Sequence, residues 1–194
     1  MTHDDHAHDH GHEHEHEHDH AHDYATDIAE QRAGKDEYFR TSRDSPIPAE
    51  KRAGFTGLPY FPADPAYRFE GLRLQPYDGT EPPAFQIPTS DGQLRPARRA
   101  GTFTFELGGN PRSLTAYVLP GGDSLFVPFL DKTSASETYG AGRYLDLEPD
   151  EDGAYDLDFN LAYHPYCVYA EEFSCPLTPA ENRLDVRIEA GERL

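Results

Sequence analysis

Short apolar runs of period two, separated by turn residues, constrain the fold of this chain most strongly. From Phe69 to Ile188 apolar side chains recur at every second position in successive short segments, which is the pattern of strands with one buried face. The turn sequences between them, such as Pro120-Gly121-Gly122-Asp123, are short enough to join neighbouring antiparallel strands. We therefore predict an all-β or β-rich α+β fold, with an antiparallel barrel-like sheet or a sandwich of about seven to eight strands.

The apolar members of these runs are expected to face the core. They are Phe69, Leu72 and Leu74; Phe103, Phe105 and Leu107; Leu114, Ala116 and Val118; Leu125, Val127 and Phe129; Leu145 and Leu147; Tyr155, Leu157 and Phe159; and Leu184, Val186 and Ile188.

One amphipathic helix is predicted over residues 24–43, ahead of the strands. The side chains that share its inner face are Tyr24, Ile28, Gln31 or Arg32, Lys35, Tyr38 and Phe39. Thr26 or Asp27 can cap its start, and Ser45-Pro46 prevents its continuation. We expect its aromatic residues to dock it on the body of the domain.

Residues 1–23 alternate histidine with Asp and Glu and contain nothing that could form a core. We expect this tail to be disordered when empty and to bind divalent transition metal, with Zn or Ni as cofactor, because imidazole and carboxylate are both ligands of such ions. A solvated acidic extension, a pH-responsive tail or a purification tag would have a similar sequence. The candidate metal ligands are His3, His6, His8, His10, His12, His14, His16, His18, His20 and His22.

The charge of the chain limits its partners. With 36 acidic against 17 basic residues, the formal net charge is −19, so neither nucleic acid nor an anionic membrane surface is expected to bind. No apolar run has the length of a membrane helix, and the N-terminus lacks the pattern of an export signal. A cytoplasmic location and a single domain over residues 24–194 are the expectation. The oligomeric state is left open.

Polar side chains suited to chemistry gather between Asp131 and Arg183. Asp158 is the candidate catalytic base, with Tyr139 and Arg143 as orienting or charge-stabilising groups. One alternative is that these groups share one cavity. In the other, Arg143 pairs internally with Asp131, Glu137 or Asp158, or Asp158 is a solvated surface charge. The candidate ligand-binding residues are Asp131, Thr133, Glu137, Asn160 and Arg183.

Cys167 and Cys175 are the only cysteines, too few for a disulfide framework. They are interpreted as structural thiols, as a redox-linked thiol pair, or, with His164, as part of a zinc site that would need a fourth ligand. The spacing does not decide among these alternatives.

Several longer stretches form a specific pattern. They are FLDKTS from Phe129, ETYGAGRY from Glu137, LDFN from Leu157, AYHPYC from Ala162, SCPL from Ser174, ENRL from Glu181 and AGE from Ala190, with KDE from Lys35, FTGL from Phe55 and DPAYR from Asp64 upstream. Together they resemble the domain of unknown function 1684 family over about residues 24–193. The resemblance implies a domain but no reaction. The pattern of that family usually has Asn at the position of His164, so no family-wide role is expected for this histidine. The histidine-rich tail lies outside the resemblance.

Three hypotheses for function follow. The first is a small β-rich domain that binds a small polar ligand and carries a metal-binding arm. The second is a metal-independent hydrolase or isomerase that acts on a small polar substrate through the Asp158, Tyr139 and Arg143 cluster. The third is a protein-interaction module.

The excess of acidic residues, with Lys only at positions 35, 51 and 132, is typical of proteins adapted to a salt-rich cytoplasm. Repulsion among these charges is screened when the Debye length falls to about 3 Å in molar salt. We therefore expect the melting temperature to rise steeply with KCl. Calorimetric melting from dilute buffer to multimolar KCl measures this, and a flat response would contradict the halophilic interpretation.

Overall fold

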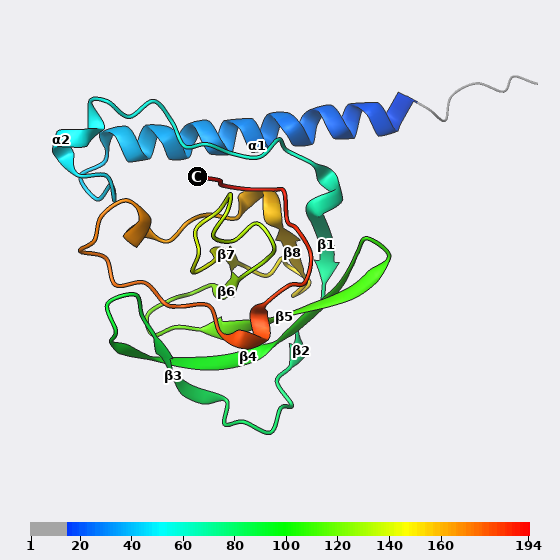
Figure 1. The fold of residues 1–194 in the computed structure, drawn as a ribbon. Coiled ribbons are helices and arrows are strands. Elements are labelled where there is room, and N and C mark those ends of the chain that lie inside the picture. Colours follow the sequence, from blue (N-terminus) through cyan, green and yellow to red (C-terminus); the bar gives the residue numbers. More distant parts are fainter. Residues whose placement is uncertain (1–14) are drawn as a thin grey trace, which may run out of the picture.

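A computed structural model describes residues 15–194, with side chains described from Tyr24 onward, as a set of antiparallel strands covered by one long helix (Figure 1). The helices are α1 (Glu15–Thr41) and α2 (Ala49–Arg52). The strands are β1 (Arg68–Leu72), β2 (Gln75–Pro76), β3 (Ala84–Pro88), β4 (Leu94–Leu107), β5 (Asn110–Val118), β6 (Leu125–Phe129), β7 (Arg143–Leu147) and β8 (Tyr155–Asp158). Four 3₁₀ turns complete the order: η1 (Pro65–Tyr67), η2 (Phe159–Leu161), η3 (Tyr166–Val168) and η4 (Ala180–Asn182).

The strands form two antiparallel sheets. The larger has six strands in the order β2-β4-β5-β6-β7, with β3 also pairing with β4, and the smaller consists of β1 and β8. Within the described residues the strands do not close into a barrel. The small sheet packs on the large one through aromatic rings, with the centroids of Phe69 and Phe105 4.7 Å apart and those of Tyr155 and Phe103 5.1 Å apart. The prediction of a β-rich antiparallel fold with one N-terminal helix is confirmed.

The period-two runs on the central strands bury the side chains that the sequence assigns to the core. These buried residues are Phe103, Phe105, Leu114, Ala116, Val127, Phe129, Leu145, Leu147 and Leu157. Their alternation with polar residues accounts for β4, β5, β6, β7 and β8, because only one register puts every apolar side chain on the inner face.

The first half of β4 and its partner β3 were not expected. Residues Ala84 to Pro88 pair with Leu94 to Arg98, yet in this hairpin only Ile87, Thr89 and Ala97 are buried. Pro88 and Pro96, with exposed arginines beside them, hide the strand pattern. Proline is tolerated here because β3 lies at an edge of the sheet.

The prediction of a final strand over Leu184, Val186 and Ile188 is wrong. Leu184 and Ile188 are buried, but this segment does not join a sheet. Its first half pairs with the segment after β6 through backbone hydrogen bonds, such as that from Leu184 N to Leu130 O (2.7 Å), around a single isolated bridge. At Ile188 side chains take the place of a neighbouring strand: Asp131 Oδ2 accepts a bond from Ile188 N (2.8 Å), and Arg143 Nη2 donates to Ile188 O (2.8 Å). Alternating hydrophobicity reports burial of one face and does not require a ladder of strands.

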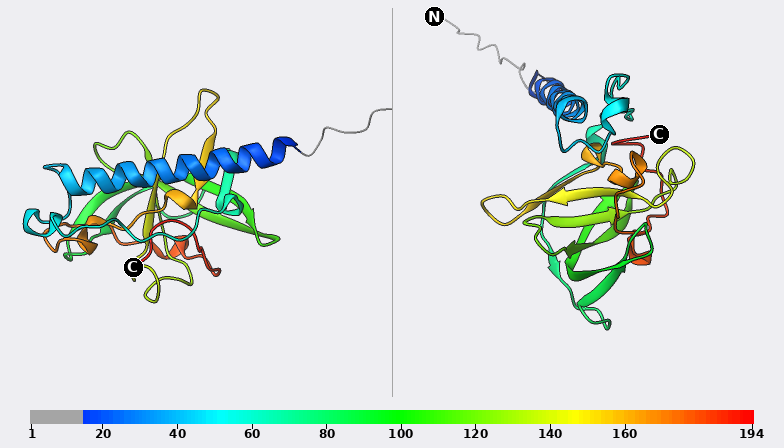
Figure 2. Two further views of the ribbon diagram at one scale, coloured as in Figure 1. Left: turned by 90° about the horizontal axis from the view of Figure 1, so that it is seen from above. Right: turned by 90° about the vertical axis from the view of Figure 1, so that its left-hand side faces the viewer.

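Helix α1 lies along the outside of the β structure (Figures 1 and 2). Tyr24, Ile28 and Phe39 are buried on its inner face, as predicted, whereas the prediction for Tyr38 is wrong, because its side chain is 41% exposed. Arg32 donates to the carbonyl oxygens of Phe61 (2.9 Å) and Asn160 (3.2 Å). The helix begins at Glu15, so its backbone includes residues that we expected in the disordered tail. No helix in the described part of the chain combines the length and hydropathy needed to cross a membrane.

The C-terminal segment runs between α1 and the sheets (Figure 1). Phe61 N donates to Gly191 O (2.9 Å), and Glu192 N donates to Ala162 O (2.8 Å). Gly191 has φ of 77°, and a Cβ atom there would lie 2.6 Å from the carbonyl oxygens of Phe159 and Ala162. Only glycine satisfies both the backbone conformation and this close approach.

We expect Gly191→Ala to destabilise the protein more than Gly109→Ala. Gly109 also has positive φ (72°), but a Cβ there meets nothing within 4 Å. The control should cost about 1–2 kcal/mol for its left-handed backbone alone, and Gly191→Ala at least about 2 kcal/mol more for the steric overlap. Urea unfolding of the two variants measures the difference. Equal losses would show that the C-terminal segment is not packed this tightly.

Candidate functional site

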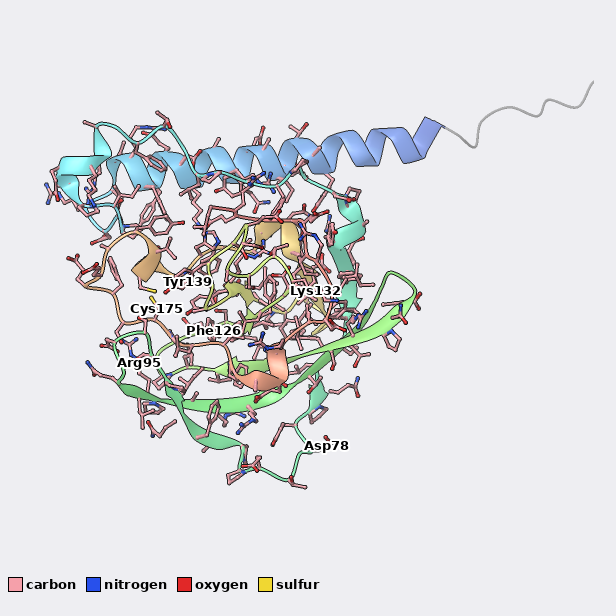
Figure 3. The ribbon with its side chains drawn as sticks, viewed as in Figure 1. Asp78, Arg95, Phe126, Lys132, Tyr139 and Cys175 are labelled. Atoms are coloured by element: carbon pink, nitrogen blue, oxygen red, sulfur yellow. The ribbon has the colours of Figure 1, made fainter. Side chains whose placement is uncertain are left out.

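A cleft of about 560 Å³ opens between α1, β7 and the segment from Tyr163 to Pro176. We call it the aromatic cleft, because five aromatic rings line it together with the polar side chains of Lys35, Asp146 and Ser174. Phe126 and Cys175, two of its residues, lie between α1 and β4 in Figure 3. Its lining consists of Lys35, Leu119, Phe126, Tyr144, Asp146, Tyr163, Pro165, Tyr166, Phe173, Ser174, Cys175 and Pro176.

Hydrogen bonds hold two of these rings in place. Tyr144 donates its hydroxyl hydrogen to Pro176 O, and Tyr163 donates to Asp146 Oδ2 (2.5 Å). Burial raises the pKa of both phenols, and the carboxylate of Asp146 raises that of Tyr163 further. Both hydroxyls are therefore neutral donors, and the rings are fixed before any ligand arrives.

A second cleft of about 250 Å³ adjoins the first, because Lys35 and Tyr163 line both. The ammonium group of Lys35 lies 4.8 Å from the centroid of the Tyr163 ring. The other residues of this cleft are Gln31, Arg32, Tyr60, Asn160, Leu161 and Glu192. Lys35 thus stands at the junction of the two hollows.

The carboxylate of Glu192, which is 1% exposed, is the acceptor at which several segments meet. Lys35 Nζ lies 2.5 Å from Oε1, while His164 N (2.7 Å) and Tyr169 Oη (3.0 Å) donate to Oε2. This carboxylate joins α1, the segment after β8 and the C-terminus. A buried charge needs such partners, because desolvation without them costs several kcal/mol.

His164 belongs to the same network and is 3% exposed. Its Nε2 accepts a hydrogen bond from Tyr139 N (3.2 Å), so the hydrogen of the neutral ring is on Nδ1, which faces Glu192 Oε2 at 3.7 Å. Burial lowers the pKa of His164 to about 4, and the positive charges of Arg143 and Lys35 contribute to that lowering. At neutral pH the ring is an uncharged part of the interior.

The predicted cluster around Arg143 lies in the interior. The guanidinium has no exposed surface; it donates to the carbonyl oxygens of Ile188 (2.8 Å), Ala190 and Glu192 (3.1 Å), and Nη2 lies 3.5 Å from Asp131 Oδ1. Asp131 also accepts bonds from Thr133 Oγ1, at 2.9 Å from each carboxylate oxygen. These contacts match the prediction that Arg143 pairs internally with Asp131.

Asp158 and Asn160 are buried beneath α1, so the surface-charge alternative for Asp158 is wrong. Asp158 accepts hydrogen bonds from the Tyr24 hydroxyl (2.8 Å) and from Asn160 N (2.9 Å). Asn160 donates to Asp64 O (2.8 Å) and accepts from Asp64 N (2.9 Å). Residues on the face opposite the core are covered because the helix and the loop before β1 form a further layer over them.

The remaining predicted residues lie apart. Glu137 forms an ion pair with Arg187 (2.6 Å), and Arg183 is exposed. Tyr139 accepts a weak hydrogen bond from Cys167 Sγ (3.8 Å), and Cys167 and Cys175 are both free thiols. Of all the predicted catalytic and ligand-binding residues and cysteines, Asn160 lines the second cleft and Cys175 the aromatic cleft. Roles in catalysis or binding for this set stay predictions.

The predicted metal ligands fall largely outside the described side chains. His3, His6, His8, His10, His12 and His14 lie outside the described residues, and only the backbone is described for His16, His18, His20 and His22. Among the side chains that are described, no group of three or more His, Cys, Asp and Glu residues is arranged to hold a metal ion. The positions of His164, Cys167 and Cys175 therefore do not support the zinc alternative.

Sequence reasoning missed most of the cleft lining. Tyr144, Tyr163 and Tyr166 resemble core residues in a sequence, and Asp146 resembles a solvent-facing strand residue. One signal was present: Lys35 occupies the inner face of the helix, where a charged side chain requires a buried partner or a site. Glu192 is that partner.

We expect His164→Asn to reduce the pH dependence of stability. The folded-state pKa near 4 lies below the ordinary value of 6.5, so between these values the unfolded chain binds more protons and stability falls as the pH falls. Without the imidazole, the free energy of unfolding should fall by on the order of 3 kcal/mol less between pH 7 and pH 4. Urea unfolding at pH 7, 6, 5 and 4 measures this, and other titrating groups are common to both proteins. Identical pH profiles would contradict the buried neutral histidine.

A family model and a solved structure are similar to this chain. The family model described as "Protein of unknown function (DUF1684)" matches residues 53–193. A solution NMR structure of the uncharacterized protein from gene locus rrnAC0354 of Haloarcula marismortui is similar, with 40% sequence identity, a TM-score of 0.66, and coverage of 91% of this chain and 97% of that chain. No curated protein matches. The chain therefore belongs to the DUF1684 family.

Proposed function

We propose that this protein is a binding domain for a small organic molecule with polar groups, and that the ligand occupies the aromatic cleft. The observation that carries the proposal is the cleft itself. Its volume of about 560 Å³ lies within the range of about 300–1,000 Å³ that is typical of ligand pockets. Like those pockets, it has a mainly apolar and aromatic lining with a few polar groups.

The rigidity of the lining supports binding. Its rings contact one another edge to face, with centroids 4.7 Å apart for Phe126 and Tyr144 and 5.3 Å apart for Tyr166 and Phe173. Because these contacts already restrict the side chains, binding a ligand costs less free energy for immobilising them.

The other two hypotheses receive less support. A hydrolase or isomerase that uses Asp158, Tyr139 and Arg143 requires these groups to reach one substrate. Asp158 and Arg143 are instead buried and bonded internally. A protein-interaction module favours an exposed apolar patch, whereas Tyr38, Leu94, Leu161 and Leu194, the exposed large hydrophobic residues of the described chain, come from separate segments.

A fragment screen followed by NMR titration tests the binding proposal. Hits should shift the amide signals of residues that line the aromatic cleft, and Ser174→Tyr should weaken them about tenfold or more by filling the space. Ser113→Tyr, on the exposed face of β5, introduces the same side chain away from the cleft and should have no effect. Hits that map elsewhere, or that tolerate Ser174→Tyr, would refute the assignment.

We also propose that the His/Asp/Glu segment binds Zn²⁺ or Ni²⁺. The backbone of α1 includes positions 16, 18, 20 and 22. In the sequence, His16 and His20, and likewise His18 and His22, are four positions apart. Two imidazoles at this spacing are a common arrangement for a divalent metal.

Calorimetric titration with Zn²⁺ tests the arm. The full chain should bind the ion, and a variant with Gln at the ten histidine positions of the tail should lose most of that binding, because Gln keeps the charge of the segment but removes the imidazoles. Adding Ni²⁺ in a second titration should give the same contrast. Equal Zn²⁺ binding by both proteins would contradict the proposal that the histidines of the tail bind metal.

A further inference from the structure

Two charged side chains line the aromatic cleft, Lys35 and Asp146, and only one of them lacks a charged partner within the described part of the chain. Lys35 is held by Glu192 at 2.5 Å, so its charge is largely neutralised. Asp146 on β7 is exposed, and none of the ion pairs among the described side chains includes it. A ligand in the cleft therefore meets an uncompensated negative charge.

Asp146 also keeps hydrogen-bonding capacity. Tyr163 Oη donates to Oδ2 (2.5 Å), and Oδ1 accepts no hydrogen bond from the described residues. A carboxylate oxygen without a partner in the protein can accept a charge-assisted bond from an ammonium or guanidinium group. The phenol of Tyr163 fixes the orientation of that carboxylate.

The aromatic lining also favours a positively charged ligand. Aromatic faces attract cations through their quadrupoles, and the Tyr163 ring already lies 4.8 Å from the ammonium nitrogen of Lys35. The formal net charge of −19 adds a long-range attraction for cations and repels anions. A carboxylate or phosphate ligand would have to displace Glu192 from Lys35 and remain near Asp146.

We propose that the aromatic cleft binds an organic cation, an ammonium or guanidinium group on a flat apolar body. The cationic group bonds to Asp146 and the body packs against the rings of Tyr144, Tyr163 and Tyr166. This inference rests on the proposed function and adds the chemical class of the ligand.

Three probes with the same phenyl body test the proposal in the full-length protein: 2-phenylethylammonium, 2-phenylethanol and 3-phenylpropanoate. Each is titrated at neutral pH and followed by amide shifts of the cleft residues. The ammonium should bind about tenfold tighter than the alcohol, and the carboxylate should bind most weakly. Raising the KCl concentration should reduce the advantage of the ammonium.

Asp146→Asn should abolish that advantage, because it removes the negative charge, while Asn keeps an oxygen that can accept the Tyr163 hydrogen bond. Glu106→Gln is the matched control: it removes one negative charge from an exposed position of β4 and should leave all three affinities unchanged. If the alcohol or the carboxylate binds in the cleft as tightly as the ammonium, the cation proposal fails and the proposed function stands. If no probe and no fragment shifts the cleft residues, both fail.

Discussion

The buried guanidinium of Arg143 is the interaction on which the rest of this structure depends. A charge taken fully out of water is costly unless hydrogen bonds and an opposite charge replace its hydration. Arg143 has both, because it donates to carbonyl oxygens of Ile188 and Glu192 and lies 3.5 Å from Asp131. Burial still lowers its pKa relative to an exposed arginine. These bonds hold the C-terminal segment together with two isolated β-bridges, between Leu130 and Arg183 and between Tyr60 and Glu192.

Holding that segment places Glu192 where three parts of the chain can reach it. Its carboxylate binds Lys35 from α1 and Tyr169 from the segment after η3, as well as the backbone of His164. Part of the wall of the aromatic cleft comes from the same parts, Lys35 on the helix and the segment from Tyr163 to Pro176, and the rest comes from the sheet. The buried hydrogen bonds of Glu192 therefore fix the positions of segments that also line the aromatic cleft.

The sequence was informative where side-chain burial alone decides structure. Alternating apolar residues such as Phe103 and Phe105 predicted the central strands, and the spacing of Tyr24, Ile28 and Phe39 predicted the docked helix. The same rule failed at Leu184 to Ile188, because whether a half-buried segment pairs with a strand or with side chains depends on residues distant in the chain. The polar residues Asp131 and Arg143 have the composition of a site, yet their partners are internal. The tyrosines of the cleft gave no signal, since a ring at a pocket wall and a ring in a core follow the same pattern.

The central claim is that Glu192 couples α1 and the segment after β8 to the C-terminus. Amide hydrogen exchange of Glu192→Gln, with exposed Glu189→Gln as the control, tests it most directly. Loss of the buried charge should reduce protection in residues 24–41 and 163–170 together, by about tenfold or more, while the β4–β5 hairpin keeps its protection. Unchanged exchange in α1, or an equal loss of protection in β4 and β5, would contradict the account.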